Sequence, residues 1–313
     1  MKRFIKNFLF VIAILLIALT VCDVALCRRI QQSSQREYQS WNAIMQGEAS
    51  SDVIVMGSSR AWAQFSPQIL DSLLGISCYN IGIDGSSINR QIDKYSMYRI
   101  YNKKPKIILQ NIDFWTIDIT KGYEKHQYFP YFWNSDFRRV VFKNEPFTLA
   151  EKIIPFYRFS HYGIKNLFKE QCKVLRGYCG LEYSWDGSKL NDIDSIVFSP
   201  SQKASAMFEE YLSKAQEEGV QVILVYAPVY SEATSRITNI AEMYQYYANI
   251  ANRYGAKIID FNSNSICNDT AYFYNATHLN KLGSELFSTE LADSIKTVLQ
   301  IQFPGSSGVS SRR

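Results

Sequence analysis

Five short apolar runs alternate with helical patterns along most of this chain, and this order constrains its fold more than any other feature. Parallel strands need a long crossover connection, usually a helix, so such alternation predicts a parallel sheet with helices on both faces. The predicted fold is therefore a three-layer α/β/α fold with a central parallel five-stranded sheet. The predicted strands are 51–56, 78–83, 106–111, 220–226 and 257–261, and the predicted helices are 66–74, 88–102, 201–218, 237–254 and 282–300.

The N-terminal segment predicts a membrane anchor. Basic residues in the first six positions precede an apolar run over 8–21, which continues to Cys27 and is interrupted only by Asp23. About twenty apolar residues are enough to cross a bilayer as a helix. We therefore expect residues 1–30 to form a cytoplasmic flank and an uncleaved transmembrane signal anchor.

The charges around this segment set its expected orientation. A positive start keeps the N-terminus in the cytoplasm, although Arg28 and Arg29 on the far side weaken that bias. Everything after residue 30 would then be exported. A cleaved signal peptide is the competing interpretation, but no Ala-x-Ala site follows the run, and neither Cys22 nor Cys27 has the small preceding residue that lipidation requires. A buried core helix is the third interpretation, which the basic flank and the long apolar run disfavour.

The rest of the chain, about 280 residues, is long enough for one large domain or two small ones, and a hydrophobic content of 47% can furnish a core. The Gly/Ser-rich end at 305–313 predicts a flexible tail. An insertion at about 114–200, between the third and fourth predicted strands, is crowded with aromatic residues. It is either a sugar-binding lid over the carboxyl edge of the sheet or a helical subdomain that its rings pack. The aromatic residues are Phe114, Trp115, Tyr123, Tyr128, Phe129, Tyr131, Phe132, Trp133, Phe156, Tyr157, Phe159 and Tyr162.

Charge and cysteine content disfavour several classes of function. The net charge of +5 is modest and partly lies beside the anchor and at the C-terminus, which gives little support for nucleic-acid binding. The chain has six cysteines and three histidines but no Cys-x-x-Cys pair, so we expect no metal and no cofactor. Cys172 and Cys179 lie close enough in sequence for a local disulfide in an exported protein. Cys78 and Cys267 have apolar neighbours, which predict burial.

Two distant segments carry the residue types of nucleophilic catalysis. The first predicted strand runs into Gly57-Ser58-Ser59-Arg60, a turn that can expose a hydroxyl. Near the other end, His278 lies in Asn275-Ala276-Thr277-His278-Leu279-Asn280. A serine hydroxyl is a weak nucleophile until a base such as histidine takes its proton, so the two segments predict a nucleophile and its base. The other histidines, His126 and His161, lack such a context and are expected to be structural or exposed.

Three blocks together resemble the SGNH/GDSL hydrolase superfamily. Its blocks one, two and five look like Gly57-Ser58-Ser59, Asn80-Ile81-Gly82-Ile83-Asp84-Gly85 and Asn275-x-x-His278-Leu279-Asn280 with Gly283. The resemblance covers most of residues 50–300 and implies an SGNH, flavodoxin-like fold with a hydrolase-like domain over 31–304. Ser58 stands where the family usually has aspartate, as in similar Gly-Ser-Ser members. The Gly-Ser-Ser-Arg variant and the anchor resemble exported proteins that act beside membrane-bound O-acyltransferases on cell-envelope polymers.

The resemblance implies a role for each matching residue. Ser59 matches the nucleophile and His278 the base. The backbone N–H groups of Ser59 and Gly85 match the oxyanion hole, where a donor can be worth about 3 kcal/mol. Asn111 is displaced by one position from the oxyanion-hole asparagine of the family. Asp113 is either a substrate contact or a turn residue at the end of a strand.

Asn275 is the most consequential departure from the family pattern. It stands where the family has the aspartate that orients the histidine, and a serine protease with that change lost about 10⁴ in turnover. An asparagine carbonyl can still accept the histidine N–H, and Asp260 or Asp269 are the nearest carboxylates that a loop could supply instead. For Ser59, the alternative to the nucleophile is a helix N-cap.

Two hypotheses of function follow. The first is a membrane-anchored, extracytoplasmic serine esterase or O-acyltransferase that moves acetyl or a related acyl group on or off a cell-envelope glycan through a Ser59 acyl-enzyme. Its partners would be an acylated polysaccharide and a membrane-bound O-acyltransferase, at the periplasmic side of a bacterial cell membrane. The second is a catalytically inactive glycan-binding or assembly protein that keeps the fold, as Asn275 and the aromatic insertion suggest. Hydrolysis and transfer share the acyl-enzyme, so the sequence leaves that choice open.

Overall fold

The computed structural model of the protein describes residues 1–118, 125–143, 147–160, 174–188 and 195–299. The predicted tail at 305–313, His161 and Cys172 lie outside the described residues. Cys179 is disulfide-bonded. Cys78 and Cys267 are free and buried, as their apolar neighbours predict.

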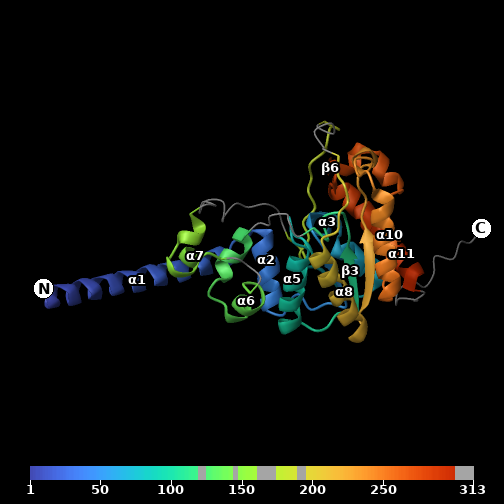
Figure 1. The fold of residues 1–313 in the computed structure, drawn as a ribbon. Coiled ribbons are helices and arrows are strands. Elements are labelled where there is room, and N and C mark those ends of the chain that lie inside the picture. The colour runs from blue at the N-terminus through green and yellow to red at the C-terminus, as the bar shows by residue number, and fades with distance from the viewer. Residues whose placement is uncertain (119–124, 144–146, 161–173, 189–194, 300–313) are drawn as a thin grey trace, which may run out of the picture. The chain divides into compact units, whose positions relative to one another are not determined.

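Five parallel strands form the central sheet (Figure 1). Their order is β2-β1-β3-β4-β5, and each neighbouring pair runs parallel. Every residue of β1 and β3 is buried, as expected for a parallel sheet that helices cover on both faces. The predicted α/β/α fold is thereby confirmed. The strands are β1 (Val53–Met56), β2 (Cys78–Asn80), β3 (Ile107–Asn111), β4 (Gln221–Tyr226) and β5 (Lys257–Asp260).

Two groups of helices cover the sheet. The face that carries Val53 and Val55 packs against α4 and α11 in one apolar core, in which the ring centroids of Phe65 and Phe287 lie 5.0 Å apart. The opposite face packs against α5, α8 and α10. Most of these helices lie close to their predicted bounds, whereas α3 and α9 were not predicted. The helices are α3 (Ser59–Gln64), α4 (Pro67–Leu74), α5 (Ile88–Tyr101), α8 (Gln202–Glu217), α9 (Ser231–Thr234), α10 (Ile240–Arg253) and α11 (Lys281–Leu299).

Local sequence signals explain where two of these helices begin. Pro67 occupies the first turn of α4, where its missing N–H costs no intrahelical hydrogen bond. Ser201 precedes α8, and its side chain accepts the backbone N–H of Ala204. Both starts agree with the predicted helices.

The described chain forms two compact units. The described residues within 1–42 and 125–171 form one, which we call the N-terminal unit, and those within 43–124 and 172–313 form the other, the sheet unit. The sequence predicts a boundary at residue 30 and an insertion at about 114–200. In the structure, residues 31–42 and the middle of that insertion group with the N-terminal helix.

Aromatic rings build the core of the N-terminal unit. Trp41 and Tyr131 pack against Phe137 with ring centroids 4.8 and 4.9 Å apart, and Phe142 packs against Phe147 at 4.5 Å. For these rings the structure favours the helical subdomain over the sugar-binding lid. The elements of the unit are α1 (Lys2–Gln31), the start of α2 (Arg36–Met45), α6 (Ser135–Val140), α7 (Leu149–Ile153) and the 3₁₀ helices η1 (Lys125–Tyr131) and η2 (Tyr157–Phe159).

Helix α1 changes character along its length. It is long and apolar enough to cross a membrane, by length and composition, and its residues before Thr20 are exposed. From there on, one side packs into the unit through Asp23, Cys27 and Ile30. A buried core helix is therefore not what the structure shows for the apolar run. Asp23, which interrupts that run, pairs with Arg158 through contacts of 2.6 and 2.8 Å.

Candidate active site

Ser59 lies at the carboxyl end of β1, where a glycine turn leads directly into α3. Gly57 has φ of 146°, and a Cβ placed on it would come within 2.6 Å of the Ala61 Cβ and 2.8 Å of the Asn111 Cβ. Only glycine fits this position. Ser58 precedes the helix, and Ser59 is the first helical residue. The alternative role of Ser59 as an N-cap is therefore not realised.

His278 lies on a short hairpin, formed by β6 (Phe273–Asn275) and β7 (His278–Leu279), that follows the 3₁₀ turns η5 (Ser265–Asn268) and η6 (Thr270–Tyr272). Asn280 ties this hairpin to its surroundings, because its Nδ2 donates to the Ala271 carbonyl at 2.7 Å. Its Oδ1 accepts the Gly283 N–H at 3.0 Å. The Asn280 and Gly283 positions that the resemblance singles out thus hold the loop that carries His278.

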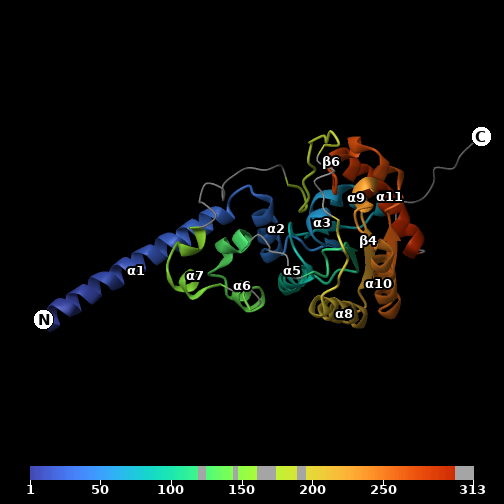
Figure 2. The same cartoon turned by 45° about the horizontal axis from the view of Figure 1, so that its top comes forward.

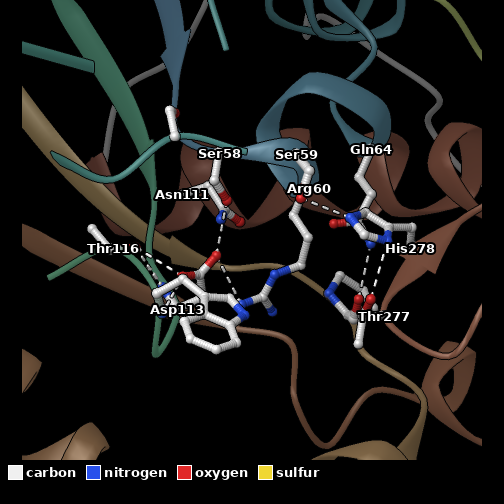
Figure 3. A network of polar contacts seen from close by, with 12 residues as sticks. Ser58, Ser59, Arg60, Gln64, Asn111, Asp113, Thr116, Thr277 and His278 are labelled. Atoms are coloured by element: carbon white, nitrogen blue, oxygen red, sulfur yellow. Dashed lines mark hydrogen bonds and ion pairs between the residues drawn. The ribbon is translucent and has the colours of Figure 1, made fainter. Parts of the chain in front are cut away.

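A continuous chain of hydrogen bonds joins three of the predicted site residues. The Ser59 Oγ lies 2.7 Å from the His278 Nε2 (Figure 3). The His278 Nδ1 lies 2.9 Å from the Asn275 Oδ1. The structure therefore brings together Ser59, His278 and Asn275, in the order that a nucleophile, a base and an orienting residue require.

The backbone of Thr277 identifies which atom of Asn275 faces the histidine. The Thr277 N–H donates to the Asn275 Oδ1 at 3.0 Å, so that atom is the amide oxygen. An oxygen facing Nδ1 accepts a hydrogen bond, which requires the proton of the neutral imidazole to be on Nδ1. The Nε2 lone pair is then free to accept the Ser59 O–H. Asn275 thus selects the tautomer that the aspartate of the family pattern would select.

The electrostatic surroundings keep His278 neutral. Burial, and to a smaller degree the positive charge of Arg60, lower the pKa of His278 to about 3. Among the described residues, its side-chain hydrogen-bond partners are Ser59, Asn275 and Thr277, and none of them is a carboxylate. The histidine is therefore available as a base at neutral pH, but its charged form lacks a counter-ion.

The two carboxylates proposed to act in place of Asn275 do not hydrogen-bond to His278. Asp269 accepts the Ala271 N–H at 2.9 Å and begins η6, and Asp260 accepts the Asn262 N–H at 2.8 Å. Both therefore act as turn residues. His126 lies in η1 of the N-terminal unit, where its backbone carbonyl accepts from the Tyr38 hydroxyl.

A buried ion pair lies beside the nucleophile (Figure 3). The Arg60 Nη2 lies 3.0 Å from the Asp113 Oδ2, and both side chains are almost fully buried. Asp113 also accepts from the Ser58 Oγ at 3.0 Å and from the Trp115 N–H at 2.7 Å. Asp113 is thus the turn residue at the end of β3, and it holds the two neighbours of Ser59 in place. The sequence showed no role for Arg60, because its partner is distant in the chain.

The two remaining oxyanion-hole candidates lie at the carboxyl edge of the sheet, Asn111 as the last residue of β3 and Gly85 on the loop after β2. Asn111 is fully buried against Gly57, and neither polar atom of its side chain hydrogen-bonds to a described residue. Gly85 lies in an exposed turn after β2 with φ of 63°. Asn80 connects this loop to α3, since its Nδ2 donates to the Ala61 carbonyl and its Oδ1 accepts the Gly82 N–H.

A small cavity opens at Ser59 and His278. Its volume is about 70 Å³, and most of its lining is apolar. A larger groove of about 400 Å³ lies between α5 and α8, but it contains no residue of the hydrogen-bonded chain. No group of three or more metal-binding side chains occurs among the described residues. The cavity residues are Ser59, Arg60, Asp113, Phe114, Trp115, Ile196, Tyr226, Val229, Ala233, Ile237, Thr277 and His278.

No protein-family model matches this chain, and no curated protein matches it. Similar solved structures include a lipolytic protein of the G-D-S-L family from Desulfitobacterium hafniense, with 11% identity, coverage of 77% of this chain and 97% of that one, and a TM-score of 0.42. An acetylxylan esterase from Geobacillus stearothermophilus has 10% identity, covers 82% and 97%, and has a TM-score of 0.41. The esterase EstA from Pseudoalteromonas has 14% identity, covers 80% and 100%, and has a TM-score of 0.43. These values are too low to transfer a function, so the function has to be argued from the site itself.

Proposed function

We propose that this protein is a serine esterase or O-acyltransferase of the SGNH type. The observation that carries the proposal is the hydrogen-bonded chain from Ser59 through His278 to Asn275, with contacts of 2.7 and 2.9 Å. The reaction begins when the Ser59 Oγ attacks the carbonyl carbon of an ester and its proton passes to the His278 Nε2. The tetrahedral intermediate collapses as the bond to the leaving oxygen breaks, and His278 returns the proton to that oxygen.

The acyl-enzyme on Ser59 is then consumed in a second step. Water or a sugar hydroxyl attacks the acyl carbon, and His278 takes the proton from the attacking oxygen. The bond to the Ser59 Oγ breaks, and the proton returns to that oxygen. Hydrolysis results when water attacks and transfer when a sugar attacks, so both activities use the same residues.

Asn111 supports the proposed function. A buried amide normally has a hydrogen-bond partner, so one without a partner is a candidate to bind a substrate atom. The Asn111 side chain has none among the described residues and lies against the turn that carries Ser59. We assign its Nδ2 to the oxyanion hole, together with the backbone N–H groups of Ser59 and Gly85. Each such donor stabilises the charge that develops on the former carbonyl oxygen.

The cavity and the anchor suggest the kind of substrate. A volume of about 70 Å³ with an apolar lining suits a short acyl group such as acetyl. Helix α1 would hold the protein in the cell membrane with the sheet unit on the periplasmic side. The polymer is then an acylated cell-envelope polysaccharide, and the acyl donor arrives through a membrane-bound O-acyltransferase.

The test is covalent labelling of the full-length protein in detergent with a fluorophosphonate, followed by intact-mass spectrometry and peptide mapping. We expect one adduct, on Ser59, and none in Ser59→Ala or His278→Ala. Ser213→Ala on the exposed side of α8 is the control, because it removes a hydroxyl that bonds only to Glu217 among the described residues and leaves the site unchanged. Absence of an adduct in the folded wild type would favour the alternative function, a catalytically inactive glycan-binding or assembly protein.

A further inference from the structure

Helix α7 of the N-terminal unit buries its glutamate and exposes its two large apolar residues. Glu151 is buried and bonds to Lys125 at 2.8 and 2.9 Å, and it closes a capping box with Thr148. Meanwhile Leu149 and Ile153 are 72% and 66% exposed. A surface helix of a water-soluble protein has the opposite arrangement.

The outward residues form one apolar surface with the segment that follows. Ile154 is 51% and Tyr157 is 40% exposed. We call Leu149, Ile153, Ile154 and Tyr157 the α7 surface. Four large apolar side chains exposed within nine residues on an ordered, capped element indicate contact with an apolar medium or partner.

An ion pair places this surface beside the point where the apolar run of α1 ends. Arg158, directly after Tyr157, contacts the Asp23 carboxylate with both of its terminal nitrogens, at 2.8 and 2.6 Å. Figures 1 and 2 both show α7 beside the C-terminal part of α1. The stretch from Phe4 to Cys22, in which Lys6, Asn7 and Thr20 are the polar residues, has a length of about 28 Å, close to the hydrocarbon thickness of a bilayer. The α7 surface therefore lies at the level where a helix crossing the bilayer would leave it.

The charges near this level suit a phospholipid surface. Lys152 is exposed on α7, between the apolar residues, and Arg28 and Arg29 are exposed on the last turns of α1. Cations and tyrosines gather at this depth because anionic headgroups attract the charges and the interface suits an amphipathic ring.

We propose that the α7 surface is a second membrane contact, embedded in the headgroup region of the leaflet from which α1 emerges. The inference rests on the proposed anchor role of α1. The α7 surface contacts the lipid bilayer itself, because it lies at the level where the apolar part of α1 ends and because cations flank it.

The experiment measures the depth of a fluorophore in full-length protein reconstituted into nanodiscs of phosphatidylglycerol and phosphatidylethanolamine. In a Cys22→Ser background, an environment-sensitive dye is attached to Ile153→Cys, to Ile12→Cys in the middle of the apolar run, or to Leu73→Cys on α4. Leu73 is 38% exposed and lies in the sheet unit, so it serves as the control for an apolar surface residue that faces water. Nitroxide groups on the lipid headgroup or deep on the acyl chain act as quenchers.

We expect headgroup nitroxides to quench the dye at residue 153 at least about threefold more than the dye at residue 73, and deep nitroxides to quench the dye at residue 12. Equal, weak quenching at 153 and 73 would overturn the proposal while strong quenching at 12 keeps the anchor. Weak quenching at all three positions would overturn the anchor and the α7 contact together. Both outcomes leave the labelling of Ser59 as a separate test of the enzyme.

Discussion

The Asn275 Oδ1 lies 2.9 Å from the His278 Nδ1 and also accepts the Thr277 N–H at 3.0 Å. This double role fixes both the amide and the imidazole, so the base has the correct tautomer without a carboxylate. What asparagine does not supply is a negative charge for the imidazolium that forms during catalysis.

Asn275→Asp is therefore expected to raise the rate. A carboxylate has nearly the shape of the amide and can accept the same two N–H groups, and it stabilises protonated His278. We expect the second-order rate of fluorophosphonate labelling to rise at least about tenfold. Asn275→Ala, which removes the acceptor altogether, is the matched control and should label more slowly than the wild type. A rate for Asn275→Asp at or below that of the wild type would show that the charge does not limit the reaction.

The pH dependence of the wild type follows from the low pKa of His278. Since burial lowers that pKa to about 3, the histidine stays neutral from neutral pH down to well below 5. The kcat/KM for a p-nitrophenyl ester should therefore be flat between about pH 5 and 7, without the decline that an ordinary histidine produces near 6.5. In Asn275→Asp the carboxylate raises the pKa, so the acid limb should move upward into the measured range. A wild-type limb centred near pH 6.5 would contradict the burial of the ring.

The sequence predicts the sheet from local patterns, and it predicts the pairing of Ser59 with His278, 219 residues apart, because a serine nucleophile needs a base. The apolar runs before Gly57 and at 106–111 read as strands from their composition alone, and the structure has strands there. The serine turn and the histidine segment are recognisable because each contains several fixed residue types.

Long-range contacts between residues that no catalytic requirement connects are what the sequence does not predict. Asp23 in an apolar run requires a buried partner, but nothing in the sequence identifies Arg158, 135 residues away, as that partner. Arg60 and Asp113 are likewise separated by two strands. The turn formed by Asn275 and Thr277 is a local signal that was missed, because an asparagine commonly accepts the N–H two residues later.

Gly57→Ala should impair both stability and labelling. The backbone at φ of 146° is accessible to glycine, and a new methyl group would meet the Ala61 Cβ and Asn111 Cβ. The strain and the overpacking together should lower the free energy of unfolding by about 2–6 kcal/mol. Gly219→Ala is the control, because Gly219 also has positive φ, 69°, but no atom lies within 4 Å of its added Cβ. Its cost should be about 1 kcal/mol in denaturant unfolding, and equal losses in the two variants would refute the steric argument.

Asp23 and Arg158 provide the sharpest test of the N-terminal unit. The pair is almost fully buried, and the Arg158 guanidinium also lies 4.6 Å from the centre of the Phe132 ring. Asp23→Leu leaves the guanidinium buried without a counter-ion, which should destabilise the unit by about 3–5 kcal/mol. Adding Arg158→Met removes the unpaired charge, so the double variant should recover most of that loss, because apolar residues of similar volume often replace a buried ion pair without cost. Thermal unfolding of the protein in detergent, monitored by proteolysis of the N-terminal unit, measures the destabilisation by Asp23→Leu and its recovery in the double variant. If the changes in the free energy of unfolding caused by the two substitutions simply add, the contact between α1 and η2 does not form in the folded protein. The same reasoning predicts that a protein that begins at residue 31 lacks Asp23, the partner of Arg158, and is less stable than the full-length chain, because helix α1 is also part of the folded unit.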